Sequence, residues 1–286
     1  SASRVQKHAP PRLGANNTCR RTLACIVKKT LNMKQTLIII GLFVSGLAFG
    51  QESKIDNFLT EIQKYDISDL LTLKKFQTEF EGDTTEIERM EPLGFIGDNY
   101  QRFYIHFISV IQNPNNTLEY FVYGKSRVKT NICSFQGIIT IKNAKTYLES
   151  DLLPLRQGFV TGDYEFFEDS DQKGTGIFKG VFKTNYYIDT KGKIHYDALN
   201  FVADGYKNNQ FQGTWTSYKS EDSKKCNWGD YRIPDSQGLD IGAGEFSVNE
   251  KYVSNGWLTY MTANGIGTDM NGEMKKAENE KWWIEK

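Results

Sequence analysis

The chain has few of the residues from which catalytic sites are most often built. It contains 3 histidines and 4 cysteines in 286 residues. No His-x-x-x-His pair indicates a zinc site, and no Gly-x-Ser-x-Gly turn accompanies the histidines. Basic and acidic residues are equal in number, at 35 each. The sequence therefore predicts no metal site, no cofactor and no nucleophile–histidine catalytic system.

The first fifty residues differ in composition from the rest of the chain. They contain eight Lys or Arg and no Asp or Glu. A charged start at Met33 leads into an apolar run that ends at Leu47, and Ala48 and Gly50 supply the small residues of a cleavage site. The run is shorter than the roughly 20 residues that span a bilayer. We therefore expect residues 33–50 to be a signal peptide.

This signal sets the expected location of the protein. Residues 1–32 precede it and are expected to be an upstream extension outside the native chain. The working protein would begin at Gln51, without a stable membrane span, and would be exported to the periplasm or the cell exterior.

Removing the signal changes the charge balance. The remainder keeps 35 − 8 = 27 basic residues against all 35 acidic ones, a net charge of −8. An acidic protein is not attracted to phosphate backbones or to anionic membranes. Nucleic acid is therefore not an expected partner.

From about residue 94 the apolar residues recur with a period of two, and aromatic and β-branched residues are frequent, as in strands. Short Asn-, Asp- and Gly-containing connections at 113–116, 169–174 and 189–192 are typical of hairpins. The pattern predicts an all-β antiparallel meander, and closure into a barrel would remove its unpaired edges. The expected strands cover 100–111, 120–132, 135–141, 158–167, 176–188, 193–202 and 211–218.

The two ends of the mature chain have a different character. Ile55, Phe58, Leu59 and Ile62 follow helical spacing, so residues 51–92 are expected to be an N-terminal helical segment with an amphipathic helix packed on the barrel. Residues 93–286 would form a single barrel-like domain. In its last third we expect a long ordered loop over 226–244 and further strands at 256–261 and 281–284.

Two cysteines remain after the signal, Cys133 and Cys226. In an oxidising compartment an even number of cysteines favours a disulfide. The alternative is two separately buried thiols, because a free cysteine packs as a small apolar residue.

One enzymatic interpretation rests on Asp240 and Glu245. Glycoside hydrolysis uses a pair of carboxyl groups, often beside aromatic residues that stack on sugars. The chain offers both, although some pairing is expected by chance among 35 acidic residues.

The segment from Asp204 to Glu245 combines aromatic residues, glycines and a few charges. Such a combination can form the mouth of a ligand pocket. The candidate ligand-binding residues are Tyr206, Trp215, Trp228 and Arg232. The alternative is that these residues close one barrel end, with both tryptophans in the core.

Gly213, Thr214 and Trp215 resemble the Gly-x-Trp element that begins a strand in the calycins, the family of lipocalin- and avidin-type barrels. The resemblance covers these three residues and the general meander, and in lipocalins the element lies near the N-terminus rather than late in the chain. It implies an up-and-down barrel that holds a small, mostly apolar ligand, with Trp215 packed across the closed end.

The sequence thus favours an exported, non-enzymatic module that binds a small apolar or sugar-like ligand. A carbohydrate-active hydrolase using Asp240 and Glu245 is one alternative. A structural cell-envelope protein without a small ligand is the other.

Overall fold

A computed structural model describes residues 55–80, 83–150, 153–265, 268–269 and 271–284. The expected signal peptide and residues 1–32 lie outside the described residues. The described chain is mostly β, and its main sheet is antiparallel throughout, which confirms the predicted class. Its strands are β1 Ile55–Asn57, β4 Leu93–Ile96, β5 Gln101–Asn113, β6 Asn116–Val128, β7 Asn131–Tyr147, β8 Arg156–Glu168, β9 Gly176–Ile188, β10 Ile194–Tyr196, β11 Asn208–Ser217 and β12 Ser223–Asp230.

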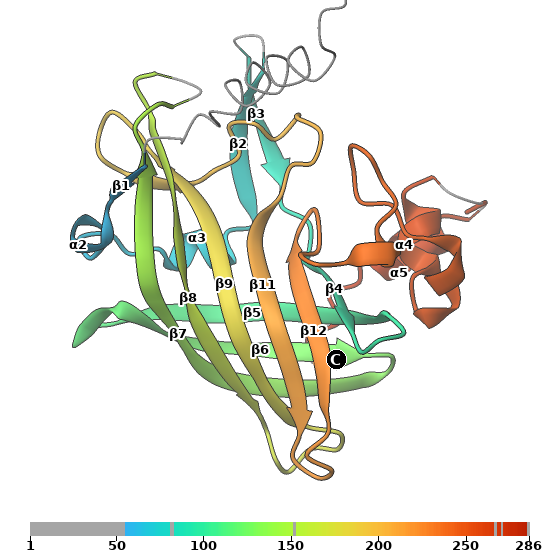
Figure 1. Ribbon diagram of the computed structural model, residues 1–286. Helices are drawn as coiled ribbons and strands as arrows, with labels where there is room; N and C mark the ends of the chain where they lie inside the picture. Colours follow the sequence, from blue (N-terminus) through green and yellow to red (C-terminus); the bar gives the residue numbers. More distant parts are fainter. Residues whose placement is uncertain (1–54, 81–82, 151–152, 266–267, 270, 285–286) are drawn as a thin grey trace, which may run out of the picture. The chain divides into compact units, whose positions relative to one another are not determined.

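Eight of these strands form a ring in which each is hydrogen-bonded to two neighbours. The order is β4-β5-β6-β7-β8-β9-β11-β12, and β12 pairs with β4 to complete the circuit. β1 and β10 add short ladders to β7 and β9. Figure 1 shows β7, β8, β9, β11 and β12 rising side by side while β5 and β6 cross behind them. The ring leaves none of its eight strands with an unpaired edge along its whole length.

The ring interior is a packed aromatic core. Phe211 of β11 stacks on Trp228 of β12 with ring centroids 5.0 Å apart. Gly213 lies beside this pair, and a Cβ at that position would be 2.6 Å from the hydroxyl oxygen of Tyr164. The absence of a side chain at Gly213, the glycine of the Gly-x-Trp element, therefore leaves room for the hydroxyl group of the buried Tyr164.

One end of the ring is covered by the segment before β4. It holds the short helices α2 Leu59–Ile62 and α3 Ser68–Thr72 and a separate hairpin, β2 Lys75–Phe80 with β3 Asp83–Glu88. Ile62, Leu70 and Leu71 are buried in the ring core. The helical expectation for residues 51–92 holds only for α2 and α3, because the other regular elements of this stretch are strands.

The C-terminal segment packs on the outer side of β4 as a second apolar cluster. It contains two short 3-10 segments, η1 Gln237–Leu239 and η2 Glu250–Asn255, and the helices α4 Leu258–Ala263 and α5 Glu273–Glu278, which Figure 1 shows beside β4 and β12. The strand expected at 256–261 is wrong, because Trp257, Tyr260 and Met261 are buried at helical spacing.

Two further expectations for the last third are corrected. Residues 226–230 belong to β12 rather than to a loop. Residues 281–284 are turns: Trp282 is buried against Arg127 and Trp283 stacks on His106 at 3.8 Å between ring centroids. In the described part of the chain, no helix has the length and hydrophobicity needed to cross a membrane.

Candidate functional site

A cavity of about 740 Å³ opens at the end of the ring away from α2 and α3, among the turns that join β4 to β5, β6 to β7, β8 to β9 and β11 to β12. We call it the ring-end cavity. Every strand of the ring contributes to its lining, so only a closed ring can form it. From β4 to β12 the contributors include Ile96, Phe103, Ser126, Cys133, Glu168, Phe178, Trp215 and Lys224.

Glu168, the last residue of β8, is the central polar group of this cavity. Its side chain points inward because Tyr164, Phe166 and Glu168 alternate with outward-facing residues along the strand. The residue is only 5% exposed. Burial raises the pKa of its carboxyl group, against the hydrogen bonds that favour the ionised form.

Three donors from three strands hold the Glu168 carboxyl group. Ser126 Oγ donates to Oε1, and the backbone N–H of Gly176 donates to Oε2 at 2.9 Å. The indole Nε1 of Trp215 donates to Oε2 at 2.8 Å. The arrangement ties β6, β8, β9 and β11 together at the mouth of the ring. Of the four predicted ligand-binding residues, Trp215 is the one that lines this cavity.

Cys133 also lines the ring-end cavity. Burial, and secondly the nearby Glu168, raise the pKa of its thiol to about 11, so the thiol is protonated at neutral pH. Cys226 is buried on β12, and both cysteines are free. The predicted disulfide is therefore wrong for this structure. β7 and β12 are not neighbours in the ring, and a disulfide requires closely placed Cα atoms.

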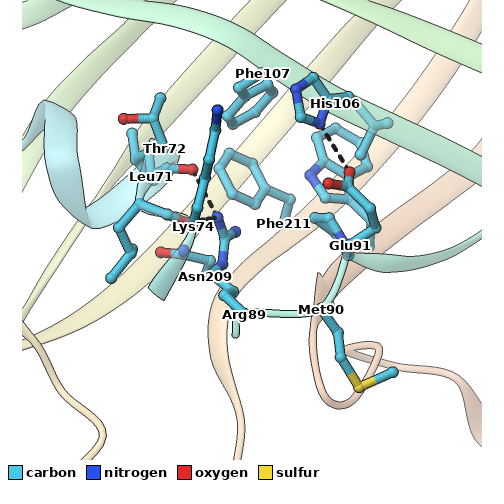
Figure 2. A pocket seen from close by; sticks show the side chains of 14 residues that line it. Leu71, Thr72, Lys74, Arg89, Met90, Glu91, His106, Phe107, Asn209 and Phe211 are labelled. Carbon is cyan, nitrogen blue, oxygen red and sulfur yellow. Dashed lines mark hydrogen bonds and ion pairs between the residues drawn. The ribbon is translucent and has the colours of Figure 1, made fainter. Parts of the chain in front are cut away.

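A second, much smaller cavity lies between α3, Lys74 and β5, and Figure 2 shows its polar side chains. Its volume is about 70 Å³, enough for a few water molecules. Arg89 makes two hydrogen bonds to the buried Asp230, at 2.9 and 2.8 Å. At the cavity edge His106 Nδ1 lies 2.9 Å from a carboxylate oxygen of Glu91.

Asp230 is the hub of a buried polar network at this end. The hydroxyl of Tyr196 and the amide of Asn209 each donate to its Oδ2 at 2.9 Å. Asn209 also donates to the carbonyl of Leu70 in α3. Because these groups satisfy one another, we interpret the network as the structural attachment of the helical cover to the ring.

The other predicted ligand-binding residues do not meet at the ring-end cavity. Trp228 is 1% exposed in the core, and the Tyr206 hydroxyl donates to the Asp197 carbonyl at 2.7 Å. Arg232 binds Asp240 at 2.8 Å and two carbonyl groups of the loop that follows. Trp228 lines the smaller cavity beside α3, and Arg232 and Tyr206 line two others.

Asp240 and Glu245 line different cavities. Besides Arg232, the Asp240 carboxylate accepts the backbone N–H groups of Gly242 and Ser247, so its oxygens organise the 240–247 loop. The arrangement does not present two carboxyl groups to one shared pocket, as glycoside hydrolysis requires.

Sequence reasoning missed Glu168 and Ser126. The available signal was the alternation within residues 158–168, which turns the carboxylate inward at the end of an apolar face. Within the described residues, no cluster of three or more His, Cys, Asp or Glu could hold a metal ion. Comparisons with models of protein families, with curated proteins and with solved structures each found no match.

Proposed function

We propose that this protein is a calycin-like barrel that binds a small ligand in the ring-end cavity. The observation that carries the proposal is a cavity of about 740 Å³ lined by all eight ring strands, with one buried carboxyl group held by Ser126, Gly176 and Trp215. Apolar walls with a few convergent polar groups are the usual make-up of small-molecule sites.

The covered end of the ring supports the same proposal. Ile62, Leu70 and Leu71 fill the opposite end, so the ligand would enter and leave at one mouth only. The proposal includes the export expected from the signal peptide at residues 33–50. It requires no catalytic group.

The test is a titration with phenylnaphthylamine, a neutral apolar dye that fluoresces when it is removed from water. We expect saturable binding with one site per chain. The substitution Val128→Trp adds a large ring at the cavity lining without removing any donor to Glu168, and should weaken binding at least about tenfold, the equivalent of about 1.4 kcal/mol.

The matched control is Val181→Trp, which adds the same ring on the outer face of β9, where Val181 is 52% exposed. This variant should bind the dye as the unchanged protein does. Absence of saturable binding, or equal effects of the two substitutions, would rule out the ring-end cavity as a ligand site.

A further inference from the structure

Three lysines from separate parts of the chain meet at the ring-end cavity. Lys129 lies in the turn between β6 and β7, Lys173 in the turn between β8 and β9, and Lys224 in β12. All three are exposed. Among the described residues none of their ammonium groups has an ion-pair partner, and Lys224 Nζ lies 5.8 Å from the ring centroid of Trp215.

Several lysines on the outer faces of the strands are paired with carboxylates. Lys179 pairs with Glu165 at 3.2 Å, Lys142 lies 3.8 Å from Asp163, and Lys225 is bound to Asp235. The unpaired lysines at the mouth therefore do not reflect a shortage of carboxylates, since the chain beyond residue 50 is acidic overall.

The charged lining of the cavity leaves an excess of positive charge at its mouth. Besides the three lysines it contains Asp98 at the mouth and Glu168 in the wall. Three positive and two negative groups leave a net charge of +1 when Glu168 is ionised. The carboxyl of Glu168 already accepts three hydrogen bonds and is buried, so it does not neutralise the exposed lysines.

Inside this mouth the accessible large apolar side chains of the lining are Val128 and Trp215, which are partly buried. Phe103 and Phe178, with ring centroids 5.4 Å apart, adjoin the cavity but are fully buried in the core. A ligand that satisfies both zones needs a flat or apolar body and an acidic group at one end.

We propose that the ring-end cavity selects an amphipathic organic anion, whose body packs on Val128 and Trp215 and whose carboxylate, sulfonate or phosphate group lies among Lys129, Lys173 and Lys224. This inference rests on the proposed binding function and names the ligand class. The ligand is a free small molecule rather than a lipid in a membrane.

Two dyes with the same skeleton test the inference. Phenylnaphthylamine is neutral, and anilinonaphthalenesulfonate carries one added sulfonate. We expect the anionic dye to bind several-fold more tightly at low salt, with an advantage that shrinks in 0.5 M salt, where the Debye length falls to a few Å. Each exposed lysine should increase the affinity for the anionic dye by a factor of about 1.4 to 5.

The decisive variant carries Lys129→Gln, Lys173→Gln and Lys224→Gln. It should lose the preference for the anionic dye and keep its affinity for the neutral one. The control carries Lys142→Gln, Lys179→Gln and Lys191→Gln, which change the net charge equally at positions outside the cavity, and should keep the preference.

The outcomes separate the two proposals. If the neutral dye does not bind, the binding function itself fails. If the neutral dye binds but the sulfonate adds nothing, or the control triple loses the preference equally, the ligand class is wrong while the cavity remains a binding site. Lysine-dependent sedimentation with phosphatidylglycerol vesicles would identify a membrane surface instead and overturn the free small molecule.

Discussion

The two ends of the ring are built from the same eight strands but are completed in different ways. At the covered end, residues 58–92 and the long connection between β9 and β11 fold back over the opening and bury apolar side chains and the Asp230 network. At the open end the strands are joined by turns, which are too short to provide a cover. The comparison shows that the connections, rather than the strands, decide which end can admit a ligand.

The buried carboxyl groups at the two ends, those of Asp230 and Glu168, also have different surroundings. Asp230 is 1% exposed and is hydrogen-bonded to Arg89, Tyr196 and Asn209. Glu168 is also buried and hydrogen-bonded, yet it forms part of the wall of a large cavity. A buried carboxylate thus fastens the cover at one end and shapes a pocket at the other.

The largest expected effect is at the covered end. Asp230→Ala leaves the guanidinium of Arg89 buried without its carboxylate, and breaking a buried pair in this way costs about 3–5 kcal/mol of unfolding free energy. Urea unfolding measures the loss. Replacing Arg89 and Asp230 together by apolar residues should cost less than the sum of the single changes, and simple additivity would contradict the pairing.

At the open end, Glu168 should make stability depend on pH. Its folded-state pKa is raised above the ordinary 4.5, so the folded protein holds this proton more tightly than the unfolded chain. The stabilisation that the protonated Glu168 provides is therefore present below about pH 4.5. It is lost as the pH rises to the folded-state pKa, and the unfolding free energy then falls by at most about 1.4 kcal/mol per pH unit.

The measurement is the difference in unfolding free energy between the unchanged protein and Glu168→Gln at several pH values. As the pH rises, the unfolding free energy of the unchanged protein should fall relative to that of Glu168→Gln, and the difference should then become constant. Glu165→Gln, on the outer face of the same strand, removes one carboxyl group elsewhere and serves as the control. A difference that does not vary with pH would show that Glu168 titrates normally.

The smallest effect is expected in the core between the two ends. The hydroxyl of Tyr164 is buried and has no hydrogen-bond partner among the described residues, and burial raises its pKa well above the ordinary value. Tyr164→Phe removes this unsatisfied group and should stabilise the fold by up to about 1 kcal/mol. Thermal unfolding measures this gain in stability. A clear destabilisation would mean that the hydroxyl of Tyr164 has a hydrogen-bond partner.

Alternation along the chain was enough to predict much of the ring. The expected strand 176–188 coincides with β9, and the expected strands 100–111 and 158–167 lie close to β5 and β8. β12 was missed because its eight residues, Ser-Lys-Lys-Cys-Asn-Trp-Gly-Asp, include only two apolar side chains, Cys226 and Trp228, and no β-branched residue. Such a composition does not favour a strand, and pairing with β11 and β4 provides the stabilisation instead.

The C-terminal segment shows the opposite limit. The aromatic residues at 257–261 and 282–283 satisfy strand propensity, yet they lie in a helix and in turns. Their conformation is decided by packing against the outer surface of β4, β5 and β6, which exists only when these strands are paired. Propensity is a weak guide where tertiary burial provides most of the stabilisation.

The sequence by itself determined the antiparallel β class, the hairpin connections and the inward and outward faces of most strands, because these depend on residues close together in the chain. The tertiary structure decided which side chains meet. It separates Tyr206, Trp228 and Arg232, and it brings Glu168, Ser126 and Trp215 together. The reason is that hydrogen bonds between strands far apart in sequence close the ring and set its register.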